Sequence, residues 1–482
     1  RTYYCSCNYN SNGDFSNSIM SKIEVDAIDK QSGSTLTLGG SGTAVTLACG
    51  ATQTGFGRTG TVDWQTSIQT SASFTAVNGQ GFFIDTSSNA ITANLPAGTA
   101  GSIVAFADYA RNFATNNLTI TPNGSQKIGG IASSAKLNVD GQGSTFVYAD
   151  DTKGWINVQN AEDTEQGATF ITATGGTITT VCTNFKVHTF TGPGTFCVSA
   201  VGNPAGSTTV DYLVAAGGGG GASQHSGGGG AGGLRFSAST FTAPPTSAPF
   251  AGSALPVSAT SFPIVVGGGG AARPGTGSPS GACSQGNSGN NSSFSTITST
   301  AGGGGGGYGS APRWLGLAGG SGGGGGSQCG TGGAGNTPPT TPSQGNTGGD
   351  GGPSIFTGGG GGGAGAVGAD SGPPQAGNGG VGLQVNINGT GHYWSGGGGG
   401  GSESNRTGGN GGLGGGGGGG SMPSGTQGTG GGSALNSGAD ASSGDGGAGG
   451  DNTGGGGGAS GANNKTGATG GSGIVIIRYK FQ

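Results

Sequence analysis

Residues 211–221 read Asp-Tyr-Leu-Val-Ala-Ala-Gly-Gly-Gly-Gly-Gly, an apolar strand that runs directly into glycines. The same order recurs where Pro-Ile-Val-Val at 263–266 leads into the glycines 267–270. The chain ends with a third apolar run, Ile-Val-Ile-Ile-Arg-Tyr at 474–479. Because β-branched and aromatic residues favour strands, we expect these three runs to form a small sheet at the base of a glycine-rich region.

Glycine is concentrated in the second half of the chain. Of 124 glycines, 24 lie in residues 1–200 and 100 lie in residues 201–482. Runs of four or more recur between polar or aromatic segments of variable length, at 217–221, 227–230, 267–270, 302–307, 322–326, 358–363, 396–401, 414–420 and 454–458. Their spacing is irregular, which excludes the Gly-X-Y period of collagen.

These glycine runs can be ordered only if hydrogen bonds offset their entropy. Ordering 100 glycines costs more than ~100 kcal/mol at roughly 1–2 kcal/mol per residue. A polyglycine II helix has about three residues per turn and no internal hydrogen bonds, so its backbone groups can bond neighbouring rods. Short runs between distinctive segments favour such packed rods over a flexible linker.

The first half of the chain has strand signals of its own. Apolar runs bounded by Gly, Asn, Asp or Pro occur at 82–84, 103–106, 117–120, 146–148 and 155–158. No 3.6-residue period stands out, so the predicted fold class is mainly β with no substantial helix. The predicted organisation is an unassigned segment 1–19, a stalk or attachment segment 20–60, a small all-β domain 61–160, a linker and β-hairpin 161–210, and a polyglycine II tip domain 211–482 closed by a strand at 474–480.

Charge and motif content argue against several functions. Only 7% of residues are charged and the net charge is −4, so no Lys/Arg cluster would bind nucleic acid. No run of 18 apolar residues predicts membrane insertion, and residues 1–19 show no signal-peptide pattern. The histidines His188, His225 and His392 fit no nucleophile or metal-ligand motif. We therefore expect no enzyme, no cofactor and no metal site.

Aspartates are scattered among the glycines of the second half. They do not recur with the nonapeptide period of calcium-binding repeats, which favours isolated carboxylates in turns. These residues are Asp350, Asp370, Asp440, Asp445 and Asp451.

The seven cysteines, an odd number, require at least one thiol that is unpaired or bonded to another chain. Cys182 and Cys197 flank Thr-Gly-Pro-Gly at 191–194. Since 185–198 reads as a hairpin, these two cysteines could face each other and form a disulfide. Cys283 and Cys329 are a weaker candidate pair.

Several stretches resemble phage tail proteins. Met20–Asp26 with Gly33–Gly40 is similar to the amino end of marine-phage tail fibres. The stretches 187–191, 212–217 and 471–479 resemble a glycine-rich domain of phage tail proteins, and the glycine-rich half resembles in style the tip adhesins of T-even-like phages. Those adhesins are separate subunits that cap a trimeric fibre, whereas here stalk and tip share one chain.

The resemblance implies a non-catalytic receptor-binding protein of the phage virion. It would be made in the host cytoplasm and act outside the cell. Its partners would be a host surface receptor (an outer-membrane protein or a glycan) and other tail or baseplate proteins, and it would form a homotrimer. Two alternatives remain open: a structural glycine-rich filament or sheath without receptor specificity, and an ice-binding slab.

Receptor contacts are expected in the segments that connect the rods, because binding residues usually lie on loops above a rigid scaffold. Aromatic side chains would supply an exposed stacking surface, or would instead cap the rods or bury against the base. The candidates are Phe294, Tyr308, Trp314, Leu315, Phe356, His392, Tyr393 and Trp394.

Overall fold

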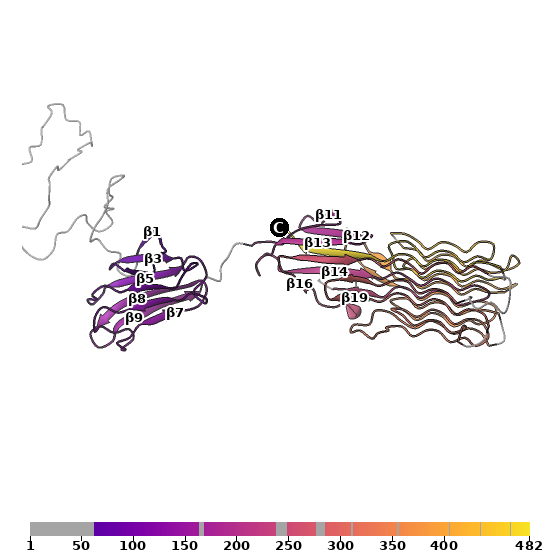
Figure 1. Ribbon diagram of the computed structural model, residues 1–482, viewed down its shortest axis with the longest axis horizontal. Helices are drawn as coiled ribbons and strands as arrows, with labels where there is room; N and C mark the ends of the chain where they lie inside the picture. Colours follow the sequence, from indigo (N-terminus) through magenta and orange to yellow (C-terminus); the bar gives the residue numbers. More distant parts are fainter. Residues whose placement is uncertain are drawn as a thin grey trace, which may run out of the picture. The chain divides into compact units, whose positions relative to one another are not determined.

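The computed structural model describes residues 62–162, 168–237, 248–275, 285–309, 312–353, 356–403, 405–433, 435–462 and 464–482. The predictions for 1–19, for 20–60 and for Cys283 lie outside these residues. The chain divides into two compact units, Arg1–Thr164 and Glu165–Gln482 (Figure 1). Apart from a single 3-10 turn, Ala248–Phe250 (η1), the regular elements of the described residues are strands. The predicted mainly β fold is confirmed.

In the first unit, most successive strands alternate between two sheets, so that the chain winds as a coil. Its strands are β1 (Asp63–Gln69), β2 (Ser73–Thr75), β3 (Gln80–Ile84), β4 (Ile91–Asn94), β5 (Ile103–Asp108), β6 (Leu118–Thr121), β7 (Ala135–Leu137), β8 (Gln142–Asp150) and β9 (Gly154–Glu162). One sheet has the order β1-β3-β5-β8-β9 and the other β2-β4-β6-β7. β1, β3 and β5 are parallel, as are β2, β4 and β6, so each turn of the coil adds one strand to both sheets.

The two sheets of this unit enclose one core. Along β8, buried and partly buried residues alternate, as expected for a strand with one face on a core. Phe82, Phe106, Phe146 and Trp155 meet there with other apolar side chains. All five apolar runs expected within 61–160 lie wholly or largely in these strands.

The second unit begins with a β-sandwich, which we call the base. Its strands are β10 (Thr172–Thr174), β11 (Thr177–Val181), β12 (Phe185–Phe190), β13 (Gly194–Ala200), β14 (Thr209–Ala215), β15 (Leu234–Phe236), β16 (Leu255–Pro256), β17 (Ser261–Val265), β18 (Ser292–Phe294), β19 (Ile297–Ser299), β20 (Leu383–Val385), β21 (His392–Trp394) and β22 (Ile474–Lys480). One sheet is β10-β13-β17-β18-β19; the other is β11-β12-β22-β14-β15, with β16 beside β14.

The base corrects two predictions about pairing. β12 and β13 do not form a hairpin, because each pairs within a different sheet. The segment 161–210 therefore contributes strands to the base. Of the three strands expected in one sheet, β14 and β22 are paired, but β17 lies in the opposite sheet. Sequence signals identified the strands, yet could not assign them to layers.

The predicted Cys182–Cys197 disulfide is wrong. Both thiols are free. Cys182 lies in the turn between β11 and β12, whereas Cys197 on β13 pairs with Thr174 and Ser261 in the other sheet. The hairpin that would have brought them together does not exist. Cys329 is also free and is exposed.

Two cores hold the base together. Phe196, Ile264 and Phe294 of one sheet meet Val475 and the other inward residues of β12, β14 and β22. On the far face of that second sheet, the hairpin β20–β21 packs its own apolar side chains against the strands. β22 serves both cores because its successive side chains point to opposite faces.

Beyond the base, the chain runs back and forth as straight rods (Figure 1). In the rod 217–222, N–H groups three residues apart donate to the same neighbouring rod, over 2.8 to 3.2 Å. The acceptors are backbone carbonyl groups, two on each of three neighbouring rods: Asn290 and Asn287 on the first, Gly471 and Ala468 on the second, and Gly230 and Gly227 on the third. Carbonyl groups of this rod accept from three further rods, through Gly302 and Gly305, Gly270, and Gly457 with Ser460. A threefold period with six neighbours is the arrangement of packed polyglycine II helices.

The interior of this slab consists of seven rods that each have hydrogen-bonded rods on six sides. They are 217–222, 227–233, 321–326, 358–363, 396–401, 416–420 and 454–460. They contain only glycine, alanine and serine. A Cβ on Gly417 would meet the carbonyl oxygen of Gly447 and, at 2.9 Å, the nitrogen of Gly458. Seven of the nine glycine runs are these interior rods.

The surface rods follow a different sequence rule. In 376–382 and 408–413, two glycines alternate with one outward residue: Asn378 and Val381, then Asn410 and Leu413, all exposed. The amide oxygen of Asn378 accepts the backbone N–H of Asn410 at 2.7 Å, and that of Asn410 accepts the N–H of Thr429 at 2.9 Å.

Three aspartate carboxylates also accept backbone N–H groups of neighbouring rods. Asp350 accepts the N–H of Gly332, Asp370 accepts that of Asp350, and Asp440 accepts that of Gly430. These three carboxylates lie on rods, and their predicted placement in turns is wrong.

Candidate binding surface

The rods place two sets of turns at opposite ends of the slab. The rod 217–222 continues β14, so the turn at 223–226 lies at the end away from the base, which we call the distal end. The described residues of the turns at this end are 223–226, 271–275 and 285, 307–309 and 312–313, 327–330, 351–353 and 356–357, 371–375, 402–403 and 405–407, 421–427, 442–445, and 461–462 and 464–466. The chain enters and leaves this unit at the base, where Phe481 donates its N–H to Asn184.

A cluster of three rings joins several distal turns. His225 lies with its ring centroid 6.4 Å from Tyr308 and 5.7 Å from Phe356, and those two rings are 6.1 Å apart. His225 is only 6% exposed, whereas Tyr308 and Phe356 are partly buried. The rings therefore pack on one another and fix the turns from which they come.

Four predicted receptor contacts lie at or beside this end. Tyr308 and Phe356 belong to the ring cluster; Trp314 and Leu315 begin the rod that follows the turn at 307–313, and both are partly buried. The backbone of Trp314 accepts the N–H of Gly326, so this residue also belongs to the slab.

The other four candidates belong to the base, and their predicted role on an exposed surface is wrong for the buried ones. Phe294 is fully buried between the sheets, 5.9 Å from Phe196. Trp394 is fully buried in the second core, where its indole N–H donates to the Val385 carbonyl at 3.3 Å. His392, 8% exposed, packs on Trp394, and Tyr393 between them is partly buried. Phe294 and Trp394 are covered by apolar side chains of strands distant in sequence, a tertiary effect that a list of aromatic residues does not contain.

Residues at the tips of the distal turns are exposed and were not predicted. Prolines stand out among them: Pro312, Pro353, Pro373, Pro374 and Pro423. Proline between glycine runs was the available signal, since it fixes φ and stops a rod from continuing. These prolines thus restrict the backbone conformations open to the turns in which they lie.

Charged side chains are also found at the distal end. Arg273 donates to the Gln285 carbonyl at 2.9 Å, and Lys465 lies 3.4 Å from the carboxylate of Asp445. Arg313 is exposed, and Glu403 and Arg406 share one turn. Acidic and basic side chains are both present, so the distal end is neither uniformly negative nor uniformly positive.

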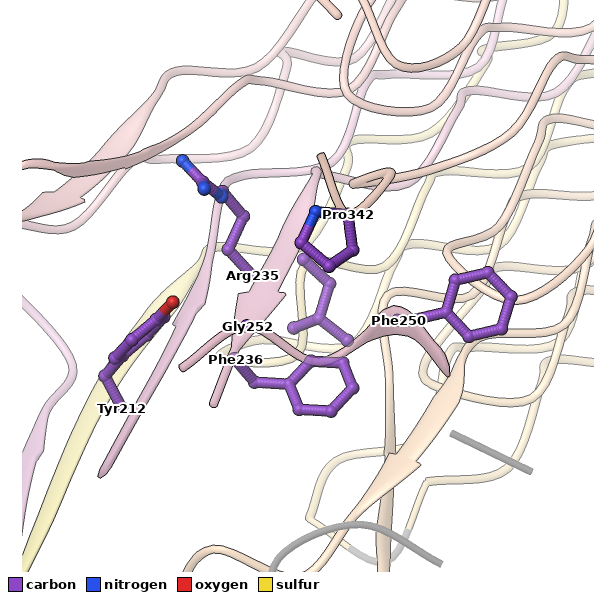
Figure 2. A pocket seen from close by; sticks show the side chains of 7 residues that line it. Tyr212, Arg235, Phe236, Phe250, Gly252 and Pro342 are labelled. Carbon is purple, nitrogen blue, oxygen red and sulfur yellow. The ribbon is translucent and has the colours of Figure 1, made fainter. Parts of the chain in front are cut away.

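A small hollow in the base is lined by both polar and apolar groups. Figure 2 shows the side chains around it, which come from Tyr212, Leu234, Arg235, Phe236, Phe250, Gly252 and Pro342. Within the described ranges, no three His, Cys, Asp or Glu side chains gather as a metal site would require. Nor do these ranges hold a helix of sufficient length and hydropathy to cross a bilayer.

The sequence comparisons agree with this geometry. The model of the glycine-rich domain family matches residues 189–451, just over half of the 482 residues. The match begins at the end of β12 and ends before the interior rod 454–460 and β22. The comparison with curated proteins found no match. The chain belongs to the glycine-rich domain family.

Proposed function

We propose that this protein is a non-catalytic receptor-binding protein of a phage tail, and that the distal turns of its slab contact the host surface. The observation that carries the proposal is where the second unit places its chain ends and its distal turns. The chain enters and leaves at the base, and one of the slab's two sets of turns lies at the opposite end, away from the base. Rigid scaffolds that display loops are a common plan for recognition.

The energetics of binding favour such a surface. A loop that is already ordered loses little conformational entropy when a partner binds. Prolines at the turn tips and the ring cluster beneath them keep the distal turns in place. The resemblance of 20–40 and 471–479 to phage tail proteins supports the host-attachment role over other kinds of recognition. A homotrimer and placement in the virion are parts of the same proposal.

Two native thiols allow a direct test. Cys329 is exposed in a distal turn, whereas Cys182 is exposed in the turn between β11 and β12, beside the chain end, where Gln482 bonds Thr183. The full chain, with all other cysteines replaced by serine, would carry a polyethylene glycol maleimide at one of these two positions. Binding of each fluorescent product to a panel of bacterial strains would then be measured.

The proposal expects saturable binding to a narrow set of strains. The polymer on Cys329 should abolish this binding because it shields the distal turns, and the polymer on Cys182 should leave it unchanged. Equal loss at both positions would move the binding site away from the distal end. Absence of binding to every strain, with assembly into filaments, would favour a structural glycine-rich filament instead.

A further inference from the structure

One buried histidine connects five segments at the distal end. The ring of His225 packs against Tyr308 and Phe356, and its carbonyl accepts the N–H of Ser327 at 3.3 Å. The preceding residue, Gln224, donates its N–H to the Ser460 hydroxyl at 2.9 Å. Gln224 and His225 both have left-handed backbone conformations, with φ of 69° and 50°. Such strain persists only where the surroundings hold it.

The hydrogen bonds of the ring define its protonation state. The ring donates to the carbonyl of Gly461. Its Nδ1 is buried and has no hydrogen-bond partner among the described residues. The donor is therefore Nε2, and the imidazole is neutral with an unshared pair on Nδ1. A proton on Nδ1 would create a buried N–H and a buried charge at a position that offers no acceptor.

The charges around the ring do not remove this penalty. Burial is the largest influence and lowers the pKa of His225 below its ordinary 6.5, while Glu403 and the Gly461 hydrogen bond act in the opposite direction. Among the described residues, the other titratable group against the ring is the phenol of Tyr308; Phe356 and Gly461 bring none. Opened turns would return the histidine to its ordinary pKa. The open form thus binds more protons, and acidification favours it.

We propose that His225 makes the order of the distal turns depend on pH, so that the binding surface is intact at neutral pH and loosens on acidification. This regulation rests on the proposed function, because it acts on the surface assigned to the receptor. The loosening begins near pH 6.5, the ordinary pKa that the histidine regains in the open form, and grows as the pH falls. Affinity would fall by at most about tenfold per pH unit, the limit for one coupled proton.

The base contains a natural comparison. His188 is also buried, and burial lowers its pKa, but both its ring nitrogens have partners. Its Nδ1 lies 2.7 Å from the Gly175 carbonyl and its Nε2 3.1 Å from the Tyr479 hydroxyl. Protonation there keeps two oxygen atoms within reach. The strands that hold His188 and Tyr479, β12 and β22, are accordingly expected to keep their structure where the distal turns do not.

Hydrogen exchange of the full chain at pH 7.5 and pH 5.0, corrected for intrinsic rates, tests this proposal. Wild-type protein should lose protection in the segments of Tyr308 and Phe356 at the lower pH, while β14 and β22 stay protected. The variant His225→Gln keeps an amide that can donate to Gly461 and does not titrate. It should show the same distal protection at both pH values.

If the glutamine substitution itself loosens the distal turns, an NMR titration of the His225 ring protons in the wild-type protein still tests the proposal. Ring protonation and loss of distal protection should share one midpoint. Protonation of His225 with fully protected turns, or turns equally protected at both pH values, would overturn the proposal. These readings need no receptor. Failure to bind any strain at either pH would instead count against the proposed function alone.

Discussion

At the scale of the residue, an interior position of the slab requires glycine, because a methyl group there would overlap the backbone of neighbouring rods. A Cβ on Gly417 would overlap the backbone of the rods at Gly447 and Gly458. Glycine to alanine at an unstrained position ordinarily stabilises by about 0.4–1 kcal/mol through the unfolded chain. Here overpacking of rigid backbone costs roughly 1–3 kcal/mol or more. We expect Gly417→Ala to lower the melting temperature, and Gly417→Val to lower it further.

The matched control is Gly432→Ala. Gly432 is exposed on a surface rod, and the nearest atom to its Cβ is a Leu413 side-chain carbon at 3.7 Å. This variant should be neutral or slightly stabilised. Calorimetry of the two alanine variants under the same conditions decides the matter. Equal melting temperatures would show that the rods tolerate a Cβ and that the packing described here is not the source of stability.

At the scale of the element, the surface rods show how the slab avoids unlimited growth. A bare rod would offer backbone groups to another slab, as the edge of a β-sheet does. The amide of Asn410 occupies such a group by accepting the N–H and the hydroxyl of Thr429. The side-chain oxygens of Asn378 and Asn410 together accept four hydrogen bonds. Asn378→Ala/Asn410→Ala should therefore cost about 2–4 kcal/mol, at roughly 0.5–1 kcal/mol per lost hydrogen bond, and should increase self-association in ultracentrifugation. Thr347→Ala, which removes an exposed side chain without a capping role among the described contacts, should stay monodisperse to the same degree as the parent.

The elements also explain what the sequence could and could not predict. Long glycine runs predicted the interior rods because only glycine fits there. The surface rods, such as 408–413 with outward Asn410 and Leu413, carry a short repeat of two glycines and one larger residue, which a search for unbroken runs overlooks. Trp394 was misplaced because its environment comes from β15 and β22, which lie far away in sequence. Layer assignment depends on such distant pairing, and local patterns do not contain it.

At the scale of the whole molecule, the last strand completes the second unit. β22 lies between β12 and β14 and is paired with both along most of its length. Its five apolar side chains, from Ile474 to Ile477 and Tyr479, are buried in the two cores. At roughly 1.5–3 kcal/mol each, their burial contributes about 10 kcal/mol, comparable with the whole stability of a typical domain. The guanidinium of Arg478 lies 3.0 Å from the buried carboxylate of Asp211, which would lose its counter-charge without β22.

Deletion of residues 474–482 should therefore prevent the base from closing, although every rod sequence remains. We expect the truncated chain to be digested rapidly by a nonspecific protease and to lack a cooperative thermal transition in the second unit. A synthetic peptide of residues 472–482 should restore both properties, because it contains the strand that pairs with β12 on one side and with β14 on the other. The same peptide with Arg478→Ala should restore them less well, since it removes the guanidinium that lies 3.0 Å from the buried carboxylate of Asp211. Protease resistance in the truncated chain equal to that of the full chain would mean that the slab folds independently of its closing strand, and that the glycine rods, rather than the base, define the folding unit.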